Sequence, residues 1–152
     1  MPTISTFFWF KEKAEEAASF YASLLPNSGI QNVTRLPGPM AVSMVEFTLE
    51  GRPFIIMESA FGAEPFNNSV SIAVLCDTQA EIDRLWAALL DGGSAMACGW
   101  LKDRYGVVWQ ITPCRLIEMT KDKDRAKAER VLGAMNKMIK LDLAGLERAF
   151  SG

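Results

Sequence analysis

Apolar and polar positions follow two periods along this chain, and the change from one period to the other marks its elements. Spacing of three and four residues is typical of an amphipathic helix, whereas alternation at every second residue is typical of a half-buried strand. Helical spacing occurs within residues 71–94, where Thr78 with Glu81 three residues later has the arrangement of a capping box. The apolar stripe of this predicted helix consists of Ile82, Leu85, Trp86 and Leu89.

The same succession of patterns occurs twice, which predicts an internal duplication. "TFFWFKEKAEEAASFYASLLPNSG" (6–29) resembles "SIAVLCDTQAEIDRLWAALLDGGS" (71–94) at a constant separation of 65 positions. Each copy reads as an apolar strand, an amphipathic helix and a turn. The constant separation superposes Thr6 on Ser71, Phe8 on Ala73, Glu16 on Glu81 and Tyr21 on Trp86.

Strand patterns follow each predicted helix. Residues 41–59 read as a hairpin that turns at Glu50-Gly51-Arg52, and a weaker strand at 30–36 precedes it. Residues 94–113 read as the corresponding hairpin, turning at 102–106, where Asp103 is expected to serve loop geometry. Each half is therefore predicted to be a strand, a helix, and two or three further strands.

The residues after the second predicted hairpin differ in composition from the two repeated halves. Residues 121–140 are highly charged with one apolar helical stripe, and Asp142 is predicted to cap a last short helix. Methionines in that stripe favour packing over ligand binding. A helical C-terminal extension is the prediction.

Composition narrows the classes of function. A net charge of −2 argues against nucleic acid as a partner, and no apolar run is long enough for a membrane span. The N-terminus lacks a basic region ahead of its short apolar run, and three irregularly spaced cysteines indicate a reducing compartment. We therefore expect a cytoplasmic protein. The sequence contains no histidine, which excludes histidine-dependent triads and histidine-ligated zinc or iron sites.

Few residues are candidates for catalysis. Cys98 lies near Lys102 and Arg104 in sequence, although a thiol packed on a strand is the simpler interpretation. Glu46 and Glu58 are the carboxylates predicted on strands, and either could act as a base if it faced an apolar enclosure. A solvated position at a strand end is the alternative for both.

Four segments carry a resemblance to a known family. They are "FFWFKEKAEEAASFYASLLPNS", "VSIAVLCDTQAEIDRLWAALLDGG", "CGWLKDRYGVVWQITP" and "RVLGAMNKMIKLDLAGLERAF". Together they resemble the PhnB-like family, often labelled 3-demethylubiquinone-9 3-methyltransferase. This family lies within the vicinal oxygen chelate superfamily of glyoxalase and bleomycin-resistance proteins.

The resemblance implies an α+β fold in which two βαβββ modules form a curved, cup-like mixed sheet. It places the modules at about 3–62 and 69–114 within a domain over 1–116, followed by a helical extension over 117–152. It also implies a homodimer, and unpaired sheet edges favour one independently. The methyltransferase label has little physical support, because no glycine-rich turn for S-adenosylmethionine follows any predicted strand.

The resemblance also assigns the positions at which metal-binding relatives hold their ion. Thr6 and Ser71 stand at the first-strand ligand positions, Gln110 stands at the last, and the remaining ligand belongs to the stretch from Ile56 to Glu58. Hydroxyl and amide oxygens with at most one carboxylate are a weak donor set for a divalent transition metal. We expect neither a metal nor another cofactor.

The predicted cup is apolar with a few polar groups, which suits a planar or partly aromatic small molecule. Its predicted ligand-binding residues are Thr6, Phe8, Ile56, Glu58, Ser71, Ala73, Trp100, Val108 and Gln110.

Three functions remain open at this point. A metal-free protein that binds a small apolar or aromatic ligand is favoured. The alternatives are a metal-independent enzyme that uses Glu58 or Glu46 as base, and a dimeric scaffold whose cup is filled by Phe8 and Trp100. The identity of the ligand is beyond one sequence.

Overall fold

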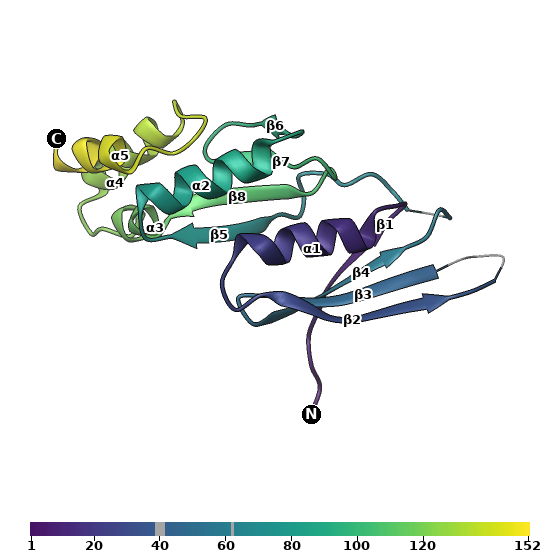
Figure 1. Ribbon diagram of the computed structural model, residues 1–152. Helices are drawn as coiled ribbons and strands as arrows, with labels where there is room; N and C mark the ends of the chain where they lie inside the picture. Colours follow the sequence, from purple (N-terminus) through teal and green to yellow (C-terminus); the bar gives the residue numbers. More distant parts are fainter. Residues whose placement is uncertain (39–41, 62) are drawn as a thin grey trace. The chain divides into compact units, whose positions relative to one another are not determined.

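A computed structural model describes residues 1–38, 42–61 and 63–152 of the chain (Figure 1). The chain folds as two compact units, residues 1–65 and residues 66–152. Each contains one βαβββ module, and the second also contains three C-terminal helices. The predicted α+β class with two such modules is confirmed. Ala41 and Gly62, the expected ends of the first hairpin and the first module, lie outside the described residues.

The first unit is a mixed four-stranded sheet with strand order β1-β4-β3-β2. β1 runs parallel to β4, and the other neighbours are antiparallel. Pro53 lies one position before β4 begins to pair with β1, so its missing N–H removes no bond to β1. The elements of this unit are β1 (Thr6–Phe10), α1 (Ala14–Leu24), β2 (Gly29–Leu36), β3 (Val42–Leu49) and β4 (Arg52–Glu58).

The second unit repeats this topology with strand order β5-β8-β7-β6. The stretch predicted as one hairpin, 94–113, contains three strands, because the short β6 precedes the hairpin of β7 and β8. The elements are β5 (Ile72–Cys76), α2 (Gln79–Leu90), β6 (Ser94–Ala95), β7 (Trp100–Lys102), β8 (Val108–Pro113), α3 (Cys114–Thr120), α4 (Arg125–Met135) and α5 (Leu143–Ser151).

The turn between β7 and β8 is organised by the buried carboxylate of Asp103, of which only 3% is exposed. Its Oδ1 accepts hydrogen bonds from the backbone N–H groups of Tyr105 and Val107, at 2.8 and 3.0 Å. Its Oδ2 accepts from the indole Nε1 of Trp109 at 2.8 Å. The prediction that Asp103 serves loop geometry is confirmed, since one side chain holds both arms of the turn.

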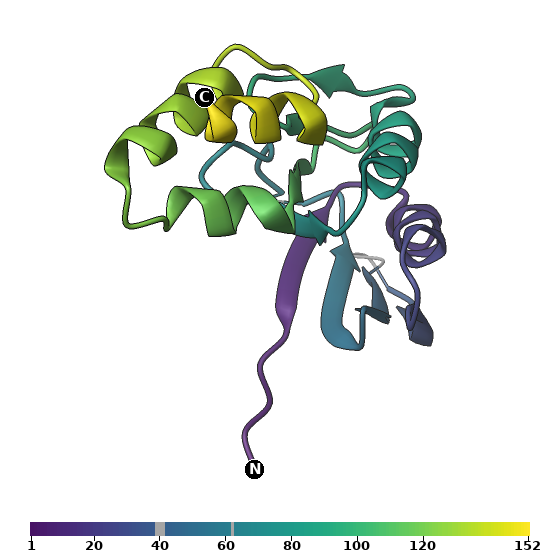
Figure 2. The same ribbon diagram turned by 90° about the vertical axis from the view of Figure 1, so that its left-hand side faces the viewer.

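The C-terminal helices gather into one cluster (Figure 2) and are an integral part of the second unit. The backbone N–H groups of Cys98 and Gly99 donate to the carbonyls of Met138 and Ile139 at 2.8 and 2.7 Å. Gly99 has a φ of +81°, and a Cβ there would lie 2.9 Å from the side chain of Leu141. The loop before β7 therefore requires a glycine at the point where the tail crosses it. The core of the tail consists of Leu116, Met119, Val131, Leu141 and Leu146.

Within the described ranges, every helix is too short or too polar to cross a lipid bilayer.

Candidate functional site

One face of the first sheet is packed against α1. The rings of Phe47 and Tyr21, the latter from α1, lie 6.5 Å apart, and Phe54 lies 5.4 Å from Phe47. Phe8 stacks on Phe54 at 6.1 Å, and Ile56 is fully buried. The placement of Phe8 and Ile56 in an open cup is therefore wrong, because both side chains lie in the core beneath α1.

The physical reason is a difference of one residue between the two strand-to-helix connections. Three residues, 11–13, join β1 to α1, whereas two residues, 77–78, join β5 to α2. The extra residue is accommodated at Lys13, whose φ of +65° is in the left-handed region. The helices therefore correspond at a separation of 65 positions, but β1 and β5 correspond at 66. A shift of one residue moves every side chain of a strand to the other face.

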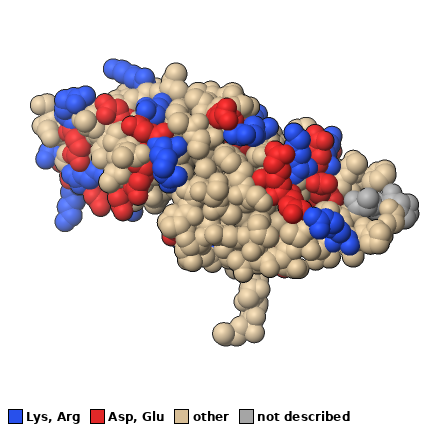
Figure 3. Space-filling model, viewed as in Figure 1, with Lys and Arg blue, Asp and Glu red and all other residues tan. Residues whose placement is uncertain are grey.

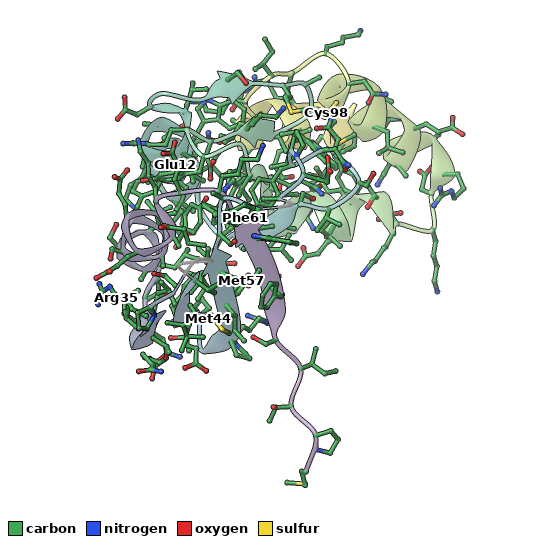
Figure 4. The ribbon with its side chains drawn as sticks, turned by 90° about the vertical axis from the view of Figure 1, so that its right-hand side faces the viewer. Glu12, Arg35, Met44, Met57, Phe61 and Cys98 are labelled. Carbon is green, nitrogen blue, oxygen red and sulfur yellow. The ribbon has the colours of Figure 1, made fainter. Side chains whose placement is uncertain are left out.

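The uncovered face of the first sheet, hereafter the open face, carries the alternate residues of its strands. On β1 these are Phe7 and Trp9, which are 50% and 38% exposed. One row across the sheet joins Phe7, Ile55, Glu46 and Asn32 as neighbours, and the next row joins Trp9, Met57, Met44 and Thr34. Figure 4 shows Met44 and Met57 beside each other on β3 and β4.

Sequence reasoning missed the residues of the open face. No local signal identifies them, because α1 lacks a capping box like that of α2, so the sequence does not fix where α1 begins or how long its connection to β1 is. Thr6 belongs to the helix side of β1, on which Phe8 and Phe10 lie.

Glu58 also lies on the helix side. Its carboxylate accepts a hydrogen bond at 2.8 Å from the backbone N–H of Ala14, the first residue of α1. The N-cap residue Lys13 provides no side-chain cap, so Glu58, at the end of β4, caps the helix instead. The prediction that Glu58 acts as a base is therefore corrected, because its carboxylate caps the N-terminus of α1.

Glu46, the other candidate base, does lie on the open face. Its side chain is exposed, and its Oε2 accepts a hydrogen bond at 2.9 Å from the amide of Asn32 on β2. The sheet positions it between Ile55 of β4 and Asn32 of β2. It is therefore the carboxylate that a ligand on this face can reach.

In the second unit, the predicted residues share one face as expected. Ala73, Gln110 and Trp100 form a row across β5, β8 and β7. The amide of Gln110 donates to the hydroxyl of Ser71 at 2.7 Å. Val108 has the same orientation on β8 but is buried. Ala73 is exposed, whereas Trp100 and Gln110 are half-buried.

Two of the three cysteines, Cys76 and Cys114, have surroundings unlike those of reactive thiols. Cys98 lies in the loop between β6 and β7 with a φ of +60°, so its expected position on a strand is wrong. Burial raises the pKa of the Cys76 thiol to about 11. Burial and the hydrogen bond to Asp77 raise the pKa of Cys114. Cys76 and Cys114 are therefore protonated and poorly nucleophilic near neutral pH.

The donors at the predicted metal positions do not fit a divalent transition metal. Ser71 and Gln110 offer only neutral oxygens, the hydroxyl of Ser71 already accepts a hydrogen bond from the amide nitrogen of Gln110, and the carboxylate of Glu58 caps α1. Across residues 1–38, 42–61 and 63–152, no group of three or more histidine, cysteine, aspartate or glutamate side chains could hold a metal ion.

The duplicated βαβββ unit, with one sheet face covered by a helix and the other open, defines the glyoxalase and bleomycin-resistance class of proteins. Residues 2–112 match the family described as 3-demethylubiquinone-9 3-methyltransferase. The chain belongs to this PhnB-like family.

Solved structures agree with this assignment. The PhnB protein of Bacillus cereus, which has the same methyltransferase description, is 34% identical, with a TM-score of 0.69 over 74% of this chain and 100% of that chain. Protein PA1353 of Pseudomonas aeruginosa is 24% identical, with a TM-score of 0.61 over 74% of this chain and 98% of that chain. The fosfomycin resistance protein FosX of Mesorhizobium loti is 13% identical, with a TM-score of 0.51 over 71% and 87%. The last two show the fold alone. No functionally curated protein matches the chain.

Proposed function

We propose that this chain is a metal-free protein that binds a small apolar or aromatic molecule on an uncovered sheet face. The observation that carries the proposal is the exposure of Phe7 and Trp9 on the open face of the first sheet. Neighbouring apolar side chains that stay exposed together on one face are typical of ligand-binding or protein-interaction surfaces. Ser71, Ala73, Trp100 and Gln110 provide a second uncovered area on the other sheet.

The scaffold alternative required Phe8 and Trp100 to fill the cup. Phe8 lies in the core beneath α1, so it contributes nothing to filling the open face. Trp100 is half-buried beside Gln110 in the second unit. This arrangement supports binding over a filled scaffold.

Methyl transfer is not part of the proposal, whatever the family description. S-adenosylmethionine is commonly held where a strand passes through a glycine-rich turn into a helix. Here β1 reaches α1 through Lys11-Glu12-Lys13, and β5 reaches α2 through Asp77-Thr78. Neither connection contains a glycine.

A metal-independent enzyme is the second candidate, and the position of Glu46 on the open face is what favours it. Glu58 no longer supports it, since that carboxylate is hydrogen-bonded to the start of α1. Glu46 is exposed rather than enclosed by apolar side chains. Binding without chemistry is therefore the better-supported function.

The experiment combines metal analysis with ligand binding on untagged protein, since a purification tag would add histidines. We expect no stoichiometric metal and no thermal shift on addition of Zn²⁺, Ni²⁺, Mn²⁺ or Fe²⁺. A neutral aromatic probe, N-phenyl-1-naphthylamine, should bind and fluoresce.

The variant Trp9→Ala should weaken probe binding several-fold, because it removes apolar contact area at the site. Ile117→Ala is the matched control, since Ile117 on α3 is 37% exposed and Trp9 is 38% exposed. Stoichiometric metal with a thermal shift of several degrees would contradict the metal-free proposal. Equal probe binding by the two variants would contradict the proposed face.

A homodimer is proposed as well. The supporting observation is that β1 and β5 each lie at the edge of their sheet within the described strand order. Such edges present unpaired backbone groups that association can cover.

A further inference from the structure

The open face of the first sheet differs from the rest of its unit in charge. Among the strand residues that the structure describes on this face, Glu46 is the one charged side chain. Arg35 of β2 points to the helix side, where it pairs with Glu15 of α1. In Figure 3, acidic and basic side chains gather over the C-terminal helices and beside the start of α1.

Glu46 retains capacity for a further partner. Asn32 donates to Oε2, and an ionised carboxylate can accept several hydrogen bonds on its two oxygens. The same Asn32 amide also donates to the hydroxyl of Thr34 at 3.1 Å. Asn32 is thereby held in place, and it fixes the exposed carboxylate of Glu46 at the surface of the sheet.

Aromatic rings lie across the sheet from this carboxylate. Phe7 is in the same row, two strands away from Glu46, which corresponds to about 10 Å at the usual strand spacing. Trp9 lies in the next row, and Met57 and Met44 lie between it and β2. A flat molecule of two fused rings can therefore contact an aromatic side chain at one end and Glu46 at the other. The methionines supply polarizable surface between them.

We infer that the open face of the first sheet selects organic cations with a flat apolar body, an inference that rests on the proposed function. A positive charge at the Glu46 end of such a ligand gains Coulomb energy, while its flat apolar body packs against Trp9 or Phe7. An anion finds no basic side chain among the described strand residues of this face and is repelled by Glu46.

The test compares three ligands of one shape and different charge: 2-naphthyltrimethylammonium, the neutral 2-naphthyl methyl sulfone, and 2-naphthalenesulfonate. Calorimetry on the full chain at low salt gives each Kd. Nitrogen-15 NMR of the indole groups shows whether Trp9 is the tryptophan that responds. We expect the cation to bind about threefold to fivefold more tightly than the neutral ligand, with the anion weakest, since an exposed ion pair is worth up to about fivefold.

Glu46→Gln should reduce the preference for the cation over the neutral ligand by about threefold to fivefold. Glu15→Gln is the matched control, because it removes the same charge from the same unit on the helix side. That variant should leave the preference unchanged.

The outcomes separate the two proposals. If the three ligands bind equally, or if Glu46→Gln does not alter the preference, the cation selectivity is overturned while ligand binding stands. If none of the three binds, the proposed function fails and this inference fails with it. Tighter binding of the sulfonate would overturn the inference directly.

Discussion

At the scale of single residues, the side chains that seemed to carry chemistry mostly determine structure. Asp103 and the candidate base Glu58 are both carboxylates, and both hold backbone N–H groups in place. Cys76 and Cys114 have pKa values raised by burial, so neither is suited to nucleophilic attack near neutral pH. The residues available for binding are instead the apolar ones that remain exposed.

Asp103 gives the first prediction about stability. Asp103→Asn places an amide N–H₂ against donors that the carboxylate now satisfies, so a buried donor loses its partner. We expect a loss of about 2–3 kcal/mol in the free energy of unfolding, measured by urea denaturation.

The control is the same chemical change at an exposed site. Asp91 pairs with Arg104 at 2.9 Å while its side chain is 77% exposed. Asp91→Asn should cost less than about 0.5 kcal/mol. Equal losses from the two variants would show that Asp103 does not organise the turn.

At the scale of elements, the two modules cap the N-terminus of their helix in different ways. α2 begins with a capping box formed by Thr78 and Glu81 within its own sequence. α1 begins after Lys13 in a left-handed conformation and takes its cap from Glu58 on β4. The start of α1 thus depends on the sheet being formed, whereas α2 has a local signal.

Removal of the cap tests this dependence. Glu58→Ala leaves the N–H of Ala14 without its carboxylate, and we expect a loss of about 1 kcal/mol in the free energy of unfolding. Glu58→Gln should lose less, because its amide oxygen still accepts a hydrogen bond while the favourable charge at the helix N-terminus is gone.

Glu129→Ala on α4 is the comparison, since that glutamate is exposed and near the middle of its helix. It should change the free energy of unfolding by no more than about 0.5 kcal/mol. A neutral effect of Glu58→Ala would mean that α1 needs no cap.

At the scale of the whole molecule, the proposed homodimer is the property to test. Both units have an edge strand, β1 or β5, with exposed apolar side chains that include Trp9 and Leu75. We expect sedimentation velocity to give a mass near twice 16.8 kDa at micromolar concentration. Leu75→Glu should shift the distribution toward the monomer, because Leu75 is an exposed apolar side chain of the edge strand β5 and is not among the proposed ligand-binding residues, whereas Ile117→Glu on α3 should not. A monomer at all concentrations would contradict the proposal.

Much of the architecture follows from patterns along the chain. The capping box, the stripe Ile82–Leu85–Trp86–Leu89 and the turn at Asp103 are all local, so period and residue type were enough to locate them. The duplication then predicted the βαβββ order of both units. For the candidate site, the predicted residues of the second sheet do lie on one face, because α2 and β5 are joined without an extra residue, although Val108 among them is buried.

Only the tertiary structure decided which face of β1 is covered by α1 and which stays exposed. Alternation along "TFFWF" separates Phe8 and Phe10 from Phe7 and Trp9, but it does not state which pair α1 will cover. Packing beneath α1, where Phe8 stacks on Phe54 and Phe54 lies against Phe47, made that choice, and the extra residue at Lys13 absorbed the difference in length. The cap from Glu58 could not be predicted from the sequence either, because Ala14 lies 44 positions away and no local pattern links the two residues. Local periodicity determines the elements, whereas contacts between distant positions determine which of their faces remain available for binding.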